Sequence, residues 1–176
     1  MKFEEALGRL ENRTWGDLFG EPDMWGSSKI KDKMTFRQPV RRFLLRAGGG
    51  GRAVSHVGVI NHLCHVNGNI CTVAGLGSIT TIVDERGKGY AHQLLDYVLA
   101  KLKEEGRAKY ALAFCTEPLV KFFRGWDKVN GNVQVLQPSK KTISVKAPYV
   151  TMFKRLQNPV PDLPLVYEIW LESFPW

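Results

Sequence analysis

Cysteine is scarce in this sequence, and long apolar runs are missing from it. The 176 residues include three cysteines at irregular spacing, an odd number that excludes a framework of paired disulfides. No segment approaches the roughly 18 consecutive apolar residues of a membrane-spanning helix. The first residues, MKFEEALGRLE, are acidic and amphipathic, unlike the basic and then apolar regions of a secretory signal. These absences predict a cytoplasmic protein that does not enter a membrane.

Basic residues are absent from the last segment of the chain. The 25 Lys and Arg residues exceed the 17 Asp and Glu residues by eight. All 25 precede Gln157, whereas Asp162, Glu168 and Glu172 follow it. The basic body predicts an anionic partner, such as nucleic acid, a membrane surface or a phosphorylated cofactor, and the acidic C-terminal segment 157–176 is suited to a cationic one.

The composition predicts a folded chain. Hydrophobic residues make up 44% and charged residues 24%, which excludes general disorder, and the length predicts one domain over residues 1–176. Apolar periodicity predicts a mixed α/β (α+β) fold, mainly antiparallel, with one parallel crossover. The predicted helices span 3–10, 89–105 and 116–123, and the predicted strands span 41–48, 55–66, 69–83, 110–115, 133–136, 143–153 and 166–171.

Two glycine-containing turns join predicted strands. Gly48–Gly51 is predicted to be a flexible hairpin loop, since phosphate-binding loops usually space their glycines. Asn67-Gly68 predicts a tight type I′ turn, which needs positive φ at both residues. That turn sets the register by placing Val66 opposite Asn69, His65 opposite Ile70 and Cys64 opposite Cys71.

The segment most suited to binding an anion is a strand that runs into a basic, glycine-rich turn and then a helix. Arg86, Gly87, Lys88 and Gly89 form this turn. The first amides of a helix lack intrahelical partners and carry partial positive charge, so they hold phosphate oxygens. A third glycine is missing at His92, which excludes the dinucleotide signature G-x-G-x-x-G, and no Gly-Lys-Ser/Thr occurs.

This segment resembles the acyl-CoA signature of the GCN5-related N-acetyltransferase (GNAT) superfamily. The pattern Arg/Gln-x-x-Gly-x-Gly/Ala is matched by Arg86, Gly89 and Ala91, and the order of elements is similar over residues 40–155. The resemblance implies a GNAT-like fold: a mixed, mostly antiparallel central sheet with a splayed parallel strand pair and flanking helices. It also implies N-acetyltransferase activity with acetyl-CoA as co-substrate.

The resemblance further implies where acetyl-CoA binds. Backbone amides around the turn would surround the pyrophosphate, and the end of the preceding strand would pair with the pantetheine arm like an added strand. The strand at 110–115 would splay away there and leave backbone groups free. The implied cofactor-binding residues are Ile79, Thr80, Thr81, Arg86, Gly87, Lys88, Gly89, Tyr90 and Ala91.

Within the superfamily, the chain is most similar to the aminoglycoside 2′-N-acetyltransferases and their uncharacterised relatives. The similarity lies in His56-Val-Gly-Val, Phe123-Arg-Gly-Trp126 and the terminal segment from Trp170 to Trp176. The chain departs from those enzymes in three places. Gly77 stands where they have a glutamate base, Lys121 where they have a tyrosine acid, and Phe174 where they have an acidic residue.

The resemblance implies an acceptor that is a primary amine of a small molecule, with an aminoglycoside-like amino sugar as the leading choice. Lys121 is a candidate catalytic residue, as donor or counter-charge for the departing thiolate, with a solvated lysine as the alternative. Glu172 and Trp176 are candidate substrate-binding residues. His62 or His65 could replace the missing base. A homodimer is a further expectation.

Three other functions compete with this one. A GNAT fold that binds acyl-CoA without chemistry would explain the missing Glu and Tyr. A zinc site would use His62, Cys64 and Cys71 on one hairpin face, but metal-binding spacings are absent, so we predict no metal. A nucleic-acid-binding module would use the net charge and aromatic residues such as Phe122, Phe123 and Trp126, but no signature of one occurs, so we predict no nucleic acid.

Overall fold

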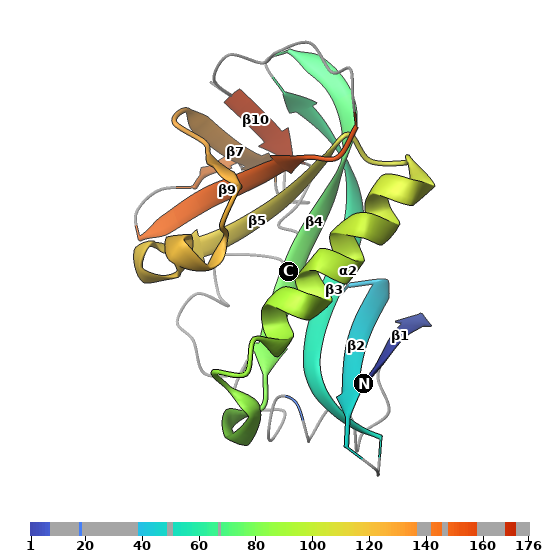
Figure 1. Ribbon diagram of the computed structural model, residues 1–176. Coiled ribbons are helices and arrows are strands. Elements are labelled where there is room, and N and C mark those ends of the chain that lie inside the picture. Colours follow the sequence, from blue (N-terminus) through green and yellow to red (C-terminus); the bar gives the residue numbers. More distant parts are fainter. Residues whose placement is uncertain are drawn as a thin grey trace.

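The computed structural model describes residues 1–7, 18, 39–48, 51–66, 68–136, 142–145, 148–157 and 168–171. These residues form a 10-stranded sheet with one long helix and two 3-10 helices (Figure 1). The strands are β1 (Lys2–Leu7), β2 (Arg41–Ala47), β3 (Arg52–Val66), β4 (Asn69–Thr81), β5 (Tyr110–Thr116), β6 (Asp127–Lys128), β7 (Asn132–Leu136), β8 (Thr142–Ser144), β9 (Tyr149–Arg155) and β10 (Glu168–Leu171). The helices are η2 (Val83–Glu85), α2 (Tyr90–Glu105) and η3 (Glu117–Phe122).

The central hairpin confirms the register predicted from its turn. β3 and β4 pair antiparallel with Val66 opposite Asn69, His65 opposite Ile70 and Cys64 opposite Cys71. Gly68 has φ +79, a left-handed value that glycine adopts without steric penalty. The β2–β3 pair likewise confirms the hairpin around Gly48–Gly51.

The sheet is mostly antiparallel and contains the predicted parallel crossover. Its strand order is β6-β9-β5-β4-β3-β10-β7-β8, with β1 pairing β2 and β2 pairing β3. β4 and β5 run parallel on either side of α2 in the chain. A second parallel pair, β10 with β7, was not predicted, because nothing local in two short strands specifies a partner that is far away in sequence.

The helix predicted over residues 3–10 is wrong for the part of it that the structure describes. Lys2–Leu7 is strand β1, which pairs antiparallel with β2. Glu5 and Glu4 form ion pairs with Arg41 and Arg46 of β2, and Phe3 stacks on Tyr97 of α2 with 4.4 Å between ring centroids. These contacts with distant residues outweigh the weak helical spacing of a short segment.

Three other boundaries also differ from the prediction. The strand expected over 143–153 is two strands, β8 and β9, which pair with β7 and β5 respectively; Pro148 precedes β9, and proline cannot donate to a ladder. The strand expected to reach Val83 ends at Thr81, before η2. The short helix after β5 is 3-10, and the Thr116 side chain does not cap it.

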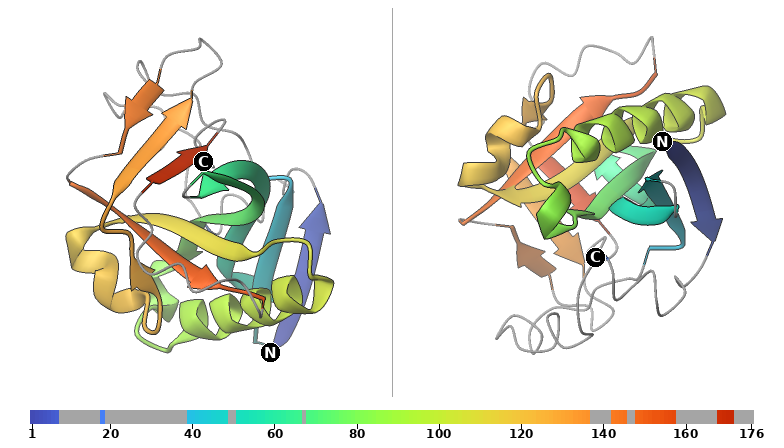
Figure 2. Two further views of the ribbon diagram at one scale, coloured as in Figure 1. Left: turned by 90° about the horizontal axis from the view of Figure 1, so that it is seen from above. Right: turned by 60° about the horizontal axis from the view of Figure 1, so that its bottom comes forward.

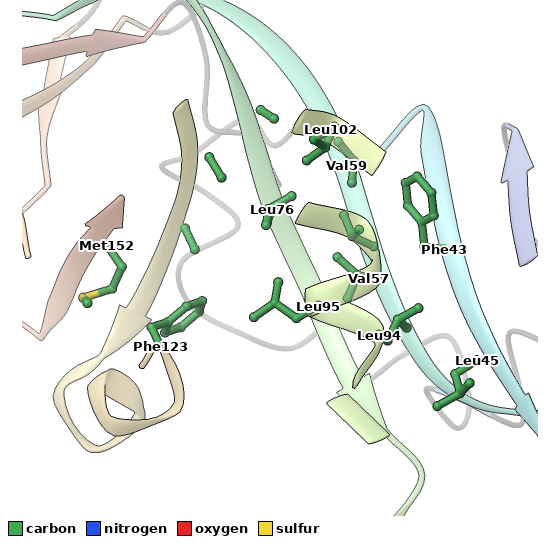
Figure 3. Close-up of a cluster of buried hydrophobic side chains, with 14 of the residues drawn as sticks. Phe43, Leu45, Val57, Val59, Leu76, Leu94, Leu95, Leu102, Phe123 and Met152 are labelled. Atoms are coloured by element: carbon green, nitrogen blue, oxygen red, sulfur yellow. The ribbon is translucent and has the colours of Figure 1, made fainter. Parts of the chain in front are cut away.

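Two hydrophobic clusters lie on the sheet. In one, the buried residues of α2 are Leu94, Leu95, Val98 and Leu102, and Figure 3 shows three of them, Leu94, Leu95 and Leu102, facing the sheet. Burial of each such side chain stabilises the fold by about 1.5–3 kcal/mol. The other cluster includes no residue of α2. In the left view of Figure 2, β7 and β10 lie on the other side of β5 from α2. It comprises Cys64, Val66, Cys71, Val73, Tyr110, Leu112, Val129 and Val133.

The α2 boundaries confirm the predicted helix. Gly89 is its N-cap and Gly106 its C-cap, both left-handed, and the Gly106 N–H donates to the Leu102 carbonyl. Of the helices in the described part of the chain, none has the length and apolar character that crossing a membrane would need.

Candidate functional site

The parallel strands β4 and β5 separate after a short paired stretch, and this opening is the first feature of the site. Their ladder covers Val73–Tyr110, Ala74–Ala111 and Gly75–Leu112. β4 then continues to Thr81 and β5 to Thr116 without pairing to each other. The splayed pair that the family resemblance implied is thus present, and we call the space between the two strands the wedge.

The glycine-rich turn after β4 presents the beginning of α2 at the open end of the wedge. Gly87 has φ +80 and Gly89 has φ +78, values that side chains disfavour. The amides of the first helical turn have no intrahelical partner, and no side chain caps them. A Cβ added at Gly87 would meet no atom within 4 Å. The backbone therefore faces open space, into which an anion fits.

A cavity of about 330 Å³ lies directly against this turn. Six of the nine predicted cofactor residues line it: Thr81, Arg86, Gly87, Gly89, Tyr90 and Ala91. Glu85, His92 and Phe122 complete the lining. The cavity joins the turn to η3, which follows β5, so it lies where the two strands have diverged.

The other three predicted residues lie beside the cavity rather than on its wall. The Ile79 side chain packs against the core under α2. The Thr80 carbonyl accepts a hydrogen bond from the Ser55 hydroxyl at 2.8 Å. Lys88 forms an ion pair with Glu85 at 2.6 Å, and that hydrogen bond raises the Lys88 pKa.

Arg86 is held against the end of β4. Its Nε donates to the Thr81 carbonyl at 3.1 Å. This contact fixes the start of the side chain at the cavity wall. A guanidinium there adds permanent positive charge to the partial charge of the helix end.

Sequence analysis missed the roles of His92 and Phe122. The His92 Nε2–H donates to the Phe122 carbonyl at 3.0 Å, and the centroids of the two side-chain rings lie 4.4 Å apart. The hydrogen bond and the ring contact connect the first turn of α2 with η3 across the cavity. His92 is one residue from the signature, but nothing in its spacing identifies a partner 30 residues away.

A β-bulge interrupts the β3–β4 ladder beside the wedge. The register passes from Gly58–Gly77 to His56–Thr80, so Val57 faces both Ser78 and Ile79. Ser78 has φ +49, the one non-glycine residue with positive φ in the described part of the chain. The His56 Nδ1 lies 2.7 Å from the Ser78 carbonyl, and its Nε2 lies 3.3 Å from Nη1 of Arg42.

His56 and Arg42 are both buried, with exposures of 0% and 2%. Burial lowers the His56 pKa to about 4, although its bond to Ser78 acts in the opposite direction. Burial also lowers the Arg42 pKa. His56 is consequently neutral at physiological pH, and sequence analysis had used it only as part of a family resemblance.

A second, larger cavity of about 520 Å³ lies between β7 and β9, at the end where β5 passes into η3. The only carboxylate among its described lining residues is Glu117, which forms an ion pair with Lys128 at 3.3 Å. The remaining lining residues are Thr116, Pro118, Val129, Gly131, Val133, Val145, Pro148, Tyr149, Val150 and Thr151.

The remaining candidate residues that the structure describes line neither cavity. Lys121 is exposed in η3 and lines neither cavity. Glu172 and Trp176 lie outside the described residues. His62 and His65 face Val73 and Ile70; Val73 is eight residues from Thr81, or about 26 Å at 3.3 Å per residue. That separation places neither histidine at the open end of the wedge.

The hairpin cysteines do not form a metal site within the described residues. Cys64 and Cys71 face each other with their sulfur atoms 3.7 Å apart, and both are free thiols. The hydrogen bond with Cys71 and burial raise the Cys64 pKa. No group of three or more potential ligands occurs among the side chains that the structure places.

Comparison with known proteins identifies the domain. The family model described as acetyltransferase (GNAT) domain matches residues 13–128, more than half of the chain. No curated protein matches the sequence significantly.

Solved structures are similar in fold. The GNAT family N-acetyltransferase YhbS of Escherichia coli, in complex with CoA, has a TM-score of 0.58 at 12% identity, over 96% of this chain and 89% of its own. A putative N-acetyltransferase of Lactobacillus plantarum has a TM-score of 0.53 at 14% identity, over 88% and 99%. A GNAT family acetyltransferase of Brucella melitensis, in complex with acetyl-CoA, has a TM-score of 0.50 at 13% identity, over 94% and 93%.

Proposed function

Since the chain belongs to the acetyltransferase (GNAT) domain family, we propose that it is an acetyl-CoA-dependent N-acetyltransferase that acts on a primary amine of a small molecule. The observation that carries the proposal is the cavity of about 330 Å³ formed by the signature turn and the first turn of α2. The YhbS and Brucella structures are of proteins with CoA and acetyl-CoA bound, and their fold is similar to that of this chain.

The residues at the turn fit a diphosphate. The Arg86 N–H donates to the Val83 carbonyl, so backbone amides from Gly87 to Ala91 would hold its oxygens, with the partial positive charge of α2 behind them. The Arg86 side chain and the Lys88 ammonium would add charge at the two sides. Gly87 and Gly89 have the left-handed φ values that favour glycine. Because they carry no side chains, the space in front of the amides stays open.

The free edge of β4 suits the amide-rich pantetheine arm. Thr80 and Thr81 pair with β3 on one side, and Ile79, Thr80 and Thr81 have no β5 partner on the other, so their backbone groups would pair with the arm as with a strand. Bound acetyl-CoA supplies the thioester whose acetyl group passes to the amine. A β4 amide beside the bulge would polarise its carbonyl, and much of the rate would come from alignment.

The acceptor is proposed to bind at the 520 Å³ cavity, away from α2. An amine is mostly protonated at neutral pH, and Glu117 would attract it there. We further propose an aminoglycoside-like amino sugar as acceptor, with Glu172 and Trp176 of the acidic segment 157–176 completing its site. Lys121 is proposed to stabilise the departing thiolate. A cytoplasmic location and a homodimer belong to the same proposal.

A second candidate function is binding of acyl-CoA without chemistry. Gly77 carries no side chain where the resembling enzymes have a glutamate base, and Lys121 lines neither cavity. Such a protein would use the wedge and turn as described above but would leave the thioester intact.

Mass spectrometry distinguishes the two functions. The protein is incubated with acetyl-CoA and a panel of aminoglycosides, amino sugars, polyamines and lysine peptides, and each acceptor is examined for the mass increase of one acetyl group. Acetylation of an aminoglycoside supports the full proposal. Acetylation of another amine retains the activity and replaces the acceptor. Acetyl-CoA binding without any acetylation favours the non-catalytic function.

A further inference from the structure

Ser78 holds a backbone conformation that a non-glycine residue adopts only when its surroundings enforce it. Its φ of +49 lies in the left-handed region, where a side chain is disfavoured. It is also the extra residue of the bulge, since β3 supplies only Val57 opposite Ser78 and Ile79. Strain of this kind persists at positions where the surrounding contacts over-determine the backbone.

The contacts that hold Ser78 come from β3 and β2. A carbonyl oxygen only accepts hydrogen bonds and a guanidinium only donates them. These properties determine the direction of both hydrogen bonds: Arg42 Nη1–H donates to His56 Nε2, and His56 Nδ1–H donates to the Ser78 carbonyl. Arg42 thus selects the His56 tautomer that can reach Ser78.

The bulge decides which β4 backbone groups face the wedge. Successive residues of a strand direct their backbone groups to opposite neighbours, and one extra residue reverses that alternation. Ser78 lies three residues beyond Gly75, where the β4–β5 pairing ends. The backbone there is bounded by β3 on one side and by the wedge on the other, so the Ser78 conformation sets the pattern of donors along the open edge.

We infer that His56, held by Arg42, is a positioning residue for the thioester of acetyl-CoA and acts on it through the Ser78 bulge. The inference rests on the proposed function, because the thioester belongs to its co-substrate. His56 does not serve as the general base, because both ring nitrogens are engaged and the side chain is fully buried. Its function is to hold one backbone conformation.

Calorimetric titration with two ligands tests this role. CoA and acetyl-CoA share every group except the acetyl thioester, so the ratio of their affinities isolates the contact at the bulge. We expect wild type to bind acetyl-CoA about fivefold more tightly than CoA, as one net hydrogen bond would give. His56→Leu should abolish the preference while CoA affinity changes by less than about twofold. His56→Asn, whose amide can still donate to Ser78, should restore it.

The outcomes separate this inference from the proposed function. A folded His56→Leu protein that keeps the preference overturns the inference, as does equal weakening of both ligands, which would mark a merely structural residue. Equal binding of the two ligands by wild type overturns it as well. Failure of wild type to bind either ligand would contradict the proposed function itself.

A measurement on wild type covers the case in which His56→Leu does not fold. Acetyl-CoA should move the NMR resonances of the His56 Nδ1–H and the Ser78 amide, whereas CoA should move those of residues 86–91 and leave the first two in place. Resonances of His56 and Ser78 that respond equally to both ligands, or to neither, would overturn the inference.

Discussion

Single residues decide what the turn before α2 can bind. Gly89 is the left-handed N-cap of the helix, and a Cβ added there would have the Gln93 side-chain nitrogen, at 3.9 Å, as its nearest contact. A short side chain at position 89 consequently fits sterically, so two short side chains that differ in charge test the effect of charge on binding. Asp and Asn both tolerate left-handed backbone and both cap helices well.

We expect Gly89→Asp to weaken acetyl-CoA binding at least about tenfold relative to Gly89→Asn, because only the aspartate places negative charge beside the pyrophosphate. Titration calorimetry measures the two affinities, and thermal unfolding confirms that both variants are folded. Equal affinities in the two variants would remove the pyrophosphate from this turn.

The neutral state of His56 makes a second prediction at this scale. Its folded pKa of about 4 lies below the usual 6.5. Above pH 6.5 neither the folded nor the unfolded state binds the proton; between 6.5 and 4 mainly the unfolded state does. Stability should fall over that range as pH decreases, by about 3 kcal/mol in total.

Denaturant unfolding at several pH values measures this loss. His56→Asn should remove it, since asparagine does not titrate, and His65→Asn at an exposed position of the same strand should retain it. A wild-type curve that parallels that of His56→Asn between pH 6.5 and 4 would mean that His56 titrates in the folded protein as it does in the unfolded one.

At the scale of elements, Arg41 joins three segments of the chain. From β2 it donates through Nε to Glu5 of β1 at 2.6 Å and through both Nη atoms to Glu105, the last residue of α2, at 2.8 and 2.6 Å. The hydrogen bond with Arg41 lowers the Glu105 pKa. The paired, two-oxygen geometry is the kind of ion pair that contributes measurably to stability.

Glu105→Gln should therefore lower the free energy of unfolding by about 1 kcal/mol at neutral pH. Glu104→Gln is the matched control: its carboxylate pairs with Lys101 at an exposed position of the same helix, where solvent screens the pair, so its effect should be smaller. The Glu105 contribution is present above the usual pKa of about 4.5 and is lost as pH falls through the lowered folded value, so the Glu105→Gln variant and wild type should converge in acid. Equal effects of the two variants at neutral pH would show that the bridge to β2 adds nothing.

Elements specified by local chemistry were the ones that sequence could predict. The sequence Asn67-Gly68 correctly predicted the β3–β4 register, and periodicity with two glycine caps predicted α2 to within one residue. β1 was predicted as a helix because its partners, Arg41 and Tyr97, are remote in the chain. The parallel β10–β7 pair went unpredicted for the same reason.

The residues of the candidate site also fall into two groups, those that a local sequence pattern predicted and those that it did not. Arg86, Gly87 and Gly89 carry a local pattern, and their position at the cavity followed from it. Arg42 and His56 have no pattern, because their partnership with Ser78 depends on a bulge that shifts the register by one residue. Their role became visible only through distances and burial.

At the scale of the whole molecule, the excess of eight positive charges creates a field that favours anions, and position decides which charges matter. Arg86 lines the cavity at the beginning of α2, and Arg107 is exposed beyond its other end. Replacing either one changes the net charge equally, so the pair separates local from global electrostatics.

We expect Arg86→Gln to weaken acetyl-CoA binding roughly tenfold at low salt and to reduce its dependence on ionic strength, because a charge-assisted contact is lost and distant charges are screened. Arg107→Gln should stay within about twofold of wild type. Titrations between about 0.05 and 0.5 M salt measure both effects. Equal weakening by the two substitutions would attribute binding to net charge alone.

The early end of the β4–β5 ladder also has a consequence for the protein without its ligand. A strand edge that lacks a partner is a template on which another chain can pair, and proteins usually cover such edges. If the pantetheine arm occupies that edge, acetyl-CoA is in effect a removable strand of the sheet. Protein purified without it should then be more prone to self-association, and the co-substrate should act as a protectant during storage.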